Sequence, residues 1–284
     1  MNNLEKLLLF VAFAFKILNP PHFIKYVFFL LLKTKQILVL SNVKISNAKI
    51  YLNLGDFIDY WIFINGLYEG SWLIKATRLI KGRVLIDIGA NIGIYTLSLF
   101  RNAKYIYAFE PERENYRRLV NNLKINSITN VKTLRKAVSN QTGKSISLYI
   151  NRDNKGWHST SIPYSNDIQR VESITLDYFI EKNKIKDIGL IKIDVEGGEL
   201  NVLAGSRKIL KKLRPTVLIE FNKPLSRMAG HNLIQIYKLL IQYNYQSYRL
   251  IGDKLIQIKL SDVPNINNEN ILFIEKNKYF ESLR

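Results

Sequence analysis

The fold is predicted most directly from Val84-Leu85-Ile86-Asp87-Ile88-Gly89-Ala90-Asn91-Ile92-Gly93. The first five residues are apolar apart from one carboxylate, as in a strand that is buried on both faces of a parallel sheet. A glycine-containing turn follows at once, and residues 95–100 then have helical character. A strand that passes through such a turn into a helix is typical of the first half of a β-α-β unit.

The rest of the chain repeats this alternation of strands and helices. Strands are expected at residues 84–88, 105–110, 131–138, 190–195, 216–221, 245–251 and 271–274, with an extra strand at 145–150. Helices are expected at residues 112–126, 199–213 and 233–242. The pattern predicts an α/β fold with a Rossmann-like, doubly wound and mostly parallel seven-stranded sheet. Ligands of such sheets bind beyond the carboxyl ends of the strands, where the strand order reverses.

The turn after the first strand predicts a cofactor site. Gly89 and Gly93 lie in the turn, Asp87 precedes it, and Glu110 ends the second strand, where it can accept both hydroxyls of a ribose. A dinucleotide site requires three glycines in G-x-G-x-x-G, whereas the spacing here is G-x-x-x-G. Asp87 would also repel a pyrophosphate. S-adenosylmethionine carries a sulfonium and an ammonium but no phosphate, so the acidic strand ends favour it.

Further motifs occur in order over about residues 83–221. They are Asp87-Ile88-Gly89-Ala90-Asn91-Ile92-Gly93-Ile94-Tyr95-Thr96, Phe109-Glu110-Pro111, Ala137-Val138-Ser139, Ile174-Thr175-Leu176-Asp177, Ile191-Lys192-Ile193-Asp194-Val195-Glu196-Gly197-Gly198-Glu199-Leu200, Val202-Leu203-Ala204-Gly205 and Ile219-Glu220. Together they resemble the FkbM-type methyltransferase family. The resemblance implies a class I methyltransferase fold, S-adenosyl-L-methionine as donor and, commonly, an acceptor oxygen on a sugar, a polyketide or another small molecule.

The same resemblance assigns cofactor-binding residues. They are Asp87, Gly89, Ala90, Asn91, Gly93, Glu110, Ala137, Val138 and Asp194. The segment from Asp87 to Gly93 would line the methionine half of the cofactor, and Glu110 would bind the ribose. Ala137 or Val138 would lie near the adenine, through backbone groups.

Methyl transfer to a hydroxyl also requires a group that takes the proton. Asp194 and Glu196 are two residues apart at the end of the fourth core strand, so we expect their side chains on one face. Glu196 is the base candidate, and Asp194 is a ligand of the cofactor or the acceptor. A salt bridge from Lys192 to one of them is the competing, purely structural interpretation. His158, in the polar loop at residues 154–161, is a second candidate base or else an exposed loop histidine.

Composition narrows the possible partners and metals. The chain has 42 Lys and Arg against 23 Asp and Glu, a formal charge of +19, which favours anionic partners or else only solvates the surface. This charge alone supports an RNA methyltransferase as an alternative, and no RNA-binding module is evident. A non-catalytic binding partner with the same fold is a further alternative. Cysteine is absent, so we expect no transition-metal site, while a magnesium ion held by carboxylates stays open.

The N-terminus adds an extension to the predicted domain. Residues 1–36 form an apolar and basic helical extension, residues 37–80 form accessory strands and a helix, and residues 81–284 form the methyltransferase domain. The apolar runs are too short to span a bilayer. Residues 4–35 are interpreted as helices on an anionic membrane surface, as a signal peptide, or as helices packed on the domain or on a second subunit. The expected location is the cytoplasm, with the inner membrane face as one option; the sequence does not indicate an oligomeric state.

Overall fold

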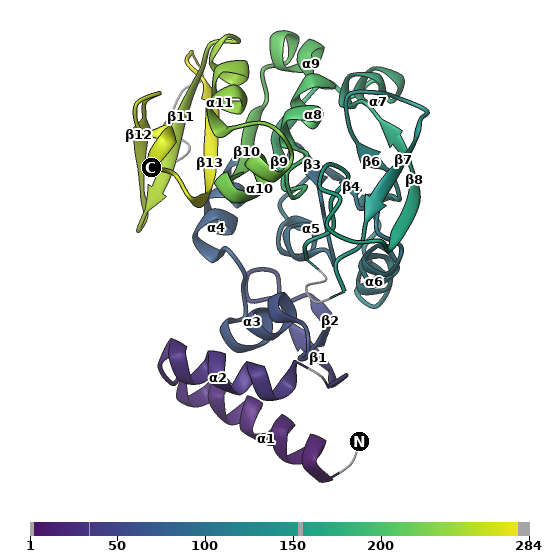
Figure 1. Ribbon diagram of the computed structural model, residues 1–284, viewed down its shortest axis with the longest axis vertical. Coiled ribbons are helices and arrows are strands. Elements are labelled where there is room, and N and C mark those ends of the chain that lie inside the picture. The colour runs from purple at the N-terminus through teal and green to yellow at the C-terminus, as the bar shows by residue number, and fades with distance from the viewer. Residues whose placement is uncertain (1–2, 34, 153–155, 278–284) are drawn as a thin grey trace.

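The computed structural model describes residues 3–33, 35–152 and 156–277, and its core is an eight-stranded sheet (Figure 1). From one edge to the other the strands are β12 (Lys254–Ile258), β11 (Tyr245–Ile251), β13 (Asn268–Glu275), β10 (Thr216–Asn222), β9 (Ile188–Ile193), β3 (Val84–Ile88), β4 (Tyr105–Phe109) and β5 (Val131–Leu134). Neighbouring strands are parallel from β5 to β10, whereas β13 is antiparallel to both of its neighbours. The predicted doubly wound, mostly parallel sheet is confirmed.

The predicted number of strands is wrong by one. The eighth strand, β12, pairs antiparallel with β11, and the register joins Ile251 to Lys254. The loop between them is therefore Gly252-Asp253, a two-residue hairpin connection in which Gly252 has a φ of +59°. A glycine followed by aspartate between two alternating runs is a hairpin signal. The sequence thus contained the evidence for this strand.

Helices cover both faces of the sheet. They are α4 (Gly70–Leu79), α5 (Ile94–Leu99), α6 (Arg113–Lys124), α7 (Leu176–Lys182), α8 (Glu199–Ala204), α9 (Arg207–Lys212), α10 (Lys223–Met228) and α11 (Leu233–Ile241), with a 3₁₀ turn, η1 (Val263–Asn265), before β13. Strand residues alternate between two hydrophobic clusters: Leu85 belongs to the cluster with α4 to α6, and Ile86 to the cluster with α7, α8, α9 and α11. Because helices bury both faces of the sheet, the sequences of its strands are continuous apolar runs.

The predicted helix at residues 199–213 is two helices, α8 and α9. They are separated at Gly205-Ser206, where the chain passes close to the backbone of Ser139. A Cβ on Gly205 would lie 2.1 Å from the Ser139 carbonyl oxygen, so only glycine fits at this crossing.

A second, three-stranded sheet lies beside the main one. It contains β6 (Ala137–Val138), β8 (Ile168–Ile174) and β7 (Ser145–Tyr149) in that order. The expected strand at residues 131–138 is therefore corrected: β5 ends at Leu134, and the last two residues pair with β8 instead. The extra strand at residues 145–150 is confirmed as β7, and β8 was missed by the sequence analysis because its polar and charged residues interrupt the apolar pattern.

The N-terminal extension is a helical hairpin followed by a short β-ribbon and a helix. It consists of α1 (Asn3–Leu18), α2 (His22–Leu32), β1 (Leu38–Asn42), β2 (Lys49–Asn53) and α3 (Phe57–Asn65). The two helices lie at the end of the molecule that is farthest from β12 (Figure 1). Leu8 of α1 and Phe63 of α3 belong to the same hydrophobic cluster as Leu85 of β3, so the extension shares a core with the domain. Among the described residues, no helix is both long and apolar enough to cross a membrane.

The turn after β3 is fixed by a close backbone crossing. Gly89 has a φ of +79°, and a Cβ there would lie 1.7 Å from the carbonyl oxygen of Asp194. Gly93 has a φ of +98°, and a Cβ there would lie 2.6 Å from Leu119 Cδ1. Both glycines are therefore required by the protein's own packing, in addition to any approach of a cofactor.

We predict that Gly89→Ala destabilises the fold by at least about 3 kcal/mol, because the new methyl group would overlap a fixed backbone carbonyl. Gly82→Ala is the matched control, since Gly82 has a φ of +69° but nothing within 4 Å of the added Cβ. It should cost only about 1 kcal/mol. Denaturant unfolding of both variants measures the difference, and equal costs would contradict the steric explanation.

Candidate active site

A cavity of about 270 Å³ lies at the carboxyl ends of the parallel strands. It lies beside the point where the strand order reverses, because β4 follows β3 on one side while β9 flanks β3 on the other. Nearly all residues predicted to form the site line this cavity: Asp87, Gly89, Ala90, Asn91, Glu110, Ala137, Val138, His158, Asp194 and Glu196. Gly93 is the exception, since it lies against Leu119 at the start of α5.

Asp87 forms the floor of the cavity beside the glycine turn. Its side chain is 1% exposed, and Oδ2 accepts a hydrogen bond of 2.7 Å from the Thr96 hydroxyl on α5. Burial raises the pKa of Asp87, and the hydrogen bond from Thr96 and the charge of Lys192 oppose this rise. A cationic ligand in the cavity would therefore stabilise the ionised form of this carboxyl group.

Glu110 follows β4 and is held by two backbone donors. The Asn91 N–H donates to Oε2 at 2.8 Å, and the Glu112 N–H donates to Oε1 at 2.9 Å. Burial nevertheless raises the pKa of Glu110 to about 8. Each carboxylate oxygen has a second lone pair, so the group can still accept hydrogen bonds from a bound ligand.

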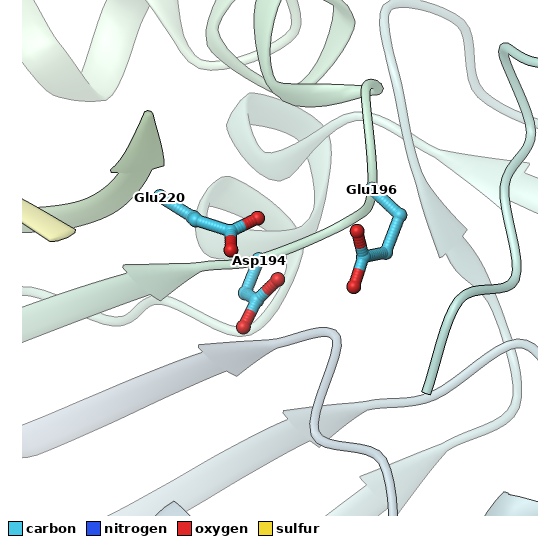
Figure 2. Close-up of side chains that lie close together, drawn as sticks. All are labelled: Asp194, Glu196 and Glu220. Atoms are coloured by element: carbon cyan, nitrogen blue, oxygen red, sulfur yellow. The ribbon is translucent and has the colours of Figure 1, made fainter. Parts of the chain in front are cut away.

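Three further carboxyl groups gather at the ends of β9 and β10. Asp194, Glu196 and Glu220 each offer an oxygen within 4.8 Å of the others, and Figure 2 shows their side chains arranged around a common space. Glu196 Oε2 and Glu220 Oε2 are buried and have no hydrogen-bond partner among the described residues. Of the described side chains, these three form the group whose carboxylates could hold a hard cation.

Lys192 supplies the positive charge next to this cluster. Its side chain is almost fully buried, and Nζ donates to Asp194 Oδ2 at 2.8 Å while lying over the Tyr95 ring. Burial lowers the pKa of Lys192, but the carboxylates of Asp194 and Glu69 raise it by more, so the ammonium stays charged. The predicted salt bridge between Lys192 and a neighbouring carboxylate is thus present.

Among the described residues, no salt bridge reaches Glu196 or Glu220. Burial raises the pKa of Glu196 well above its ordinary value, and the charges of Asp194 and Glu220 add to this rise. Burial and Asp194 likewise raise the pKa of Glu220. Because burial and the neighbouring carboxylates raise both pKa values, the two groups hold protons at a pH where an exposed glutamate is ionised. A carboxylate of raised pKa is a stronger base once it ionises.

A family model described as the methyltransferase FkbM domain matches residues 87–247, more than half of the 284 residues. The chain belongs to this methyltransferase family. The matched segment begins at Asp87 and includes Glu110, Asp194, Glu196 and every other predicted site residue, so it contains most of the cavity lining. The resemblance inferred from the motifs is confirmed.

Individual relatives are similar at lower identity. Methyltransferase sdnD of Sordaria araneosa is 27% identical over 205 residues, which cover 60% of this chain and 75% of the relative. Hexuronic acid methyltransferase AglP of Haloferax volcanii is 29% identical over 157 residues, which cover 55% of this chain and 61% of AglP. Among solved structures, the methyltransferase FkbM of Methylobacillus flagellatus KT has a TM-score of 0.46 at 18% identity and covers 68% of this chain and 44% of that chain.

In this FkbM-family chain, Asp194 and Glu196 meet for a reason other than the one predicted. Strand alternation does not apply, because β9 ends at Ile193 and Glu196 has a φ of +52°. The turn is held by Glu199, whose Oε1 accepts hydrogen bonds from the N–H groups of Val195 and Gly197 at 3.3 and 3.1 Å. A left-handed glutamate is strained, and such strain is found at functional sites.

The loop that carries His158 lies against the cavity. Trp157, His158 and Thr160 line the cavity, and the Ser159 hydroxyl donates to the Glu196 carbonyl at 2.7 Å. Asn154 and Lys155, part of the predicted loop motif, lie outside the described residues. The Asn151 N–H donates to His158 Nδ1 at 3.1 Å, so the neutral ring carries its proton on Nε2. This tautomer presents a donor, and the geometry therefore favours Glu196 over His158 as the base.

Glu69 also lines the cavity, although no sequence pattern predicted it. It precedes α4; Oε2 accepts from the Tyr95 hydroxyl at 2.7 Å and Oε1 accepts from Asn270 Nδ2 at 2.6 Å. It lies outside the matched family segment and in no motif, so no local signal could have identified it. Glu220 was recognised only as part of a motif, although its place at the end of the fifth core strand was a usable signal.

The raised pKa of Glu110 predicts how stability depends on pH. Between the unfolded value of about 4.5 and the folded value of about 8, the folded chain retains a proton that the unfolded chain has lost. The free energy of unfolding of the ligand-free protein should therefore fall as the pH rises through this window. Glu110→Gln should make the fall smaller, and Glu181→Gln, at an exposed position on α7, should not. Thermal unfolding at several pH values measures both, and an unchanged slope in Glu110→Gln would contradict the assignment.

Proposed function

We propose that this family member transfers a methyl group from S-adenosyl-L-methionine to a hydroxyl of a sugar or another small molecule. The observation that carries the proposal is the acidic cavity at the reversal of strand order, where Asp87, Glu110 and the three-carboxylate cluster outnumber the two lysines of the lining. Of these lysines, Lys192 is paired with Asp194 and Lys136 with Glu172. An excess of buried carboxyl groups suits a donor that brings a sulfonium and an ammonium. A pyrophosphate-containing dinucleotide would meet the same charges unfavourably.

The positions of the carboxyl groups support one orientation of the donor. The methionine half would lie beside Asp87 and the turn at Gly89, and the ribose hydroxyls would donate to Glu110. The adenine would lie toward Ala137 and Val138, which also line the cavity. This arrangement leaves the sulfonium methyl group directed toward the cluster of Asp194, Glu196 and Glu220.

The reaction requires little chemistry from the protein. The acceptor oxygen attacks the methyl carbon, a C–O bond forms as the C–S bond breaks, and S-adenosylhomocysteine leaves. Glu196 accepts the hydroxyl proton. The ion pair between Asp194 and Lys192 holds the Asp194 side chain in place at the edge of the cluster. Because the donor is already activated, orientation and exclusion of water supply most of the remaining acceleration.

A sugar acceptor is supported by two observations. AglP, one of the relatives, is named as a hexuronic acid methyltransferase. In this chain, Tyr68 and Trp157 line the cavity together with the carboxyl groups, so apolar rings and hydrogen-bond acceptors occur side by side. This combination suits a sugar, whose hydroxyls need acceptors and whose C–H face packs on aromatic rings.

The donor assignment is tested by calorimetry. Glu110→Ala should weaken S-adenosylhomocysteine binding by about tenfold to a hundredfold, because two hydrogen bonds to the Glu110 carboxyl group are lost. Glu181→Ala, on the surface of α7, is the control and should bind as the wild type does. The wild type should not respond to NAD. Wild-type affinity in Glu110→Ala would contradict the ribose assignment, and failure of the wild type to bind S-adenosylhomocysteine would contradict the proposed donor.

The base assignment is tested by turnover with labelled donor and a panel of sugars. Glu196→Gln should lower kcat by roughly a hundredfold or more while S-adenosylhomocysteine affinity changes by less than about threefold. In the wild type, kcat/KM should rise as the pH increases, because Glu196 must lose its proton before it can act. Glu196→Gln should lose this dependence.

Glu220→Gln provides the matched comparison for the base. Removing its charge should move the rise in kcat/KM to lower pH, because the Glu220 charge helps raise the pKa of Glu196. The assays should proceed equally well in EDTA. Loss of activity in EDTA and its recovery with Mg²⁺ would instead mean that the cluster holds a metal and that Glu196 is not the base.

A further inference from the structure

The helical hairpin of α1 and α2 has an unusually apolar outer surface. On α1 the exposed large apolar residues are Leu4, Leu7, Phe10, Phe13, Ile17 and Leu18. On α2 they are Phe23, Ile24, Tyr26, Val27, Leu30 and Leu31. These side chains are between 43 and 82% exposed, and in each helix they cover about half of the circumference. We call these twelve residues the hairpin face.

The residues on the opposite side of each helix are buried against the protein. Leu8 and Ala12 of α1, and Phe28, Phe29 and Leu32 of α2, belong to the hydrophobic core. Both helices are therefore apolar all round, although only one side of each is covered. Surface helices of water-soluble proteins place polar residues on the outer side. Of the exposed large apolar residues that the described chain presents, half belong to the hairpin face. A patch of this kind marks a surface that is covered in the functional state.

The dimensions of the hairpin exclude a membrane-spanning role for it. With 16 and 11 residues, α1 and α2 are about 24 and 16 Å long, whereas the hydrocarbon core of a bilayer is about 30 Å thick. The two helices contact each other through Phe15 and Phe28, whose ring centroids are 4.9 Å apart, and they lie side by side across one end of the molecule (Figure 1). Their geometry suits a pair of helices that lie in the plane of a surface.

The charge around the hairpin face identifies the surface that it fits. Residues 1–55 contain seven lysines and no arginine, and their acidic residues are limited to Glu5. Lys6 and Lys33, beside the hairpin face, are exposed. A second copy of the chain would bring the same positive charge to the contact and no acidic complement. An anionic lipid surface offers both the negative charge and the apolar layer beneath it.

We propose that α1 and α2 dock this enzyme on an anionic lipid bilayer, with the hairpin face inserted at the level of the headgroups and acyl chains and the lysines among the lipid phosphates. Packing continues from the hairpin to the cavity: Phe29 of α2 contacts Phe57 of α3 with ring centroids 5.4 Å apart, and Phe57 lines the cavity. In the docked enzyme, one layer of helices separates the cavity from the lipid.

Vesicle flotation tests this proposal. The full chain is synthesised in the presence of vesicles of phosphatidylcholine alone, or of phosphatidylcholine with phosphatidylglycerol. The wild type should float with the anionic vesicles and be released in part by high salt. Phe10→Ser combined with Ile17→Ser should lower the bound fraction by about tenfold, and Lys6→Glu combined with Lys33→Glu should abolish the preference for anionic lipid.

Ile251→Ser combined with Ile256→Ser is the matched control, because both residues are exposed and belong to β11 and β12, which lie far from α1 and α2 (Figure 1). This variant should float as the wild type does. Circular dichroism and the thermal midpoint check that each variant folds, independently of methyl transfer. A wild type that does not float, or that floats equally well after the Phe10 and Ile17 changes, would overturn the proposal. A stable dimer in light scattering that forms through the hairpin face and excludes vesicles would also overturn it.

Discussion

The turns after β3 and β9 cross so closely that only a glycine fits between them. Gly89 faces the carbonyl oxygen of Asp194, and the Asp194 N–H donates in turn to the Ile88 carbonyl at 3.0 Å. This crossing sets the distance between the glycine turn and the acidic cluster, and therefore the width of the cavity between them. The carboxyl groups of Asp194 and Glu196 matter for chemistry, but their position depends on Gly89, because only a residue without a side chain fits at the crossing.

The electrostatics of the cavity follow from this geometry. Several carboxyl groups are removed from water in a small volume, and the lining offers two lysines against them, Lys192 and Lys136. Burial of the charged forms is costly, so Glu110, Glu196 and Glu220 respond by retaining protons. The ligand-free site is thus less favourable than it would be with a cation present. A cationic donor would recover part of this cost, which links cofactor binding to the stability of the whole domain.

Much of the fold could be predicted because it depends on local patterns. The apolar run at Val84–Ile88 and its glycine turn predicted a buried strand at the reversal of strand order, and the motifs contain most of the residues that line the cavity. The failures involve contacts between distant segments. Glu69 reaches the cavity through Tyr95 and Asn270, 26 and 201 residues away in the sequence, and no spacing rule encodes such a contact. The break of the helix at Gly205 likewise depends on the passing backbone of Ser139.

The acidic cavity lies in a chain with a formal charge of +19. The negative charge of the cavity and the positive charge of the surface act over different distances. At physiological ionic strength, charges farther apart than about 8 Å are largely screened, so a donor inside the cavity responds to its carboxyl lining and not to the basic surface. The surface charge acts before binding, when it attracts anionic partners and repels cationic ones. An anionic lipid surface, as proposed for the hairpin face, is a partner of the attracted kind. The basic exterior and the acidic interior therefore favour different molecules, the exterior anionic ones and the interior cationic ones.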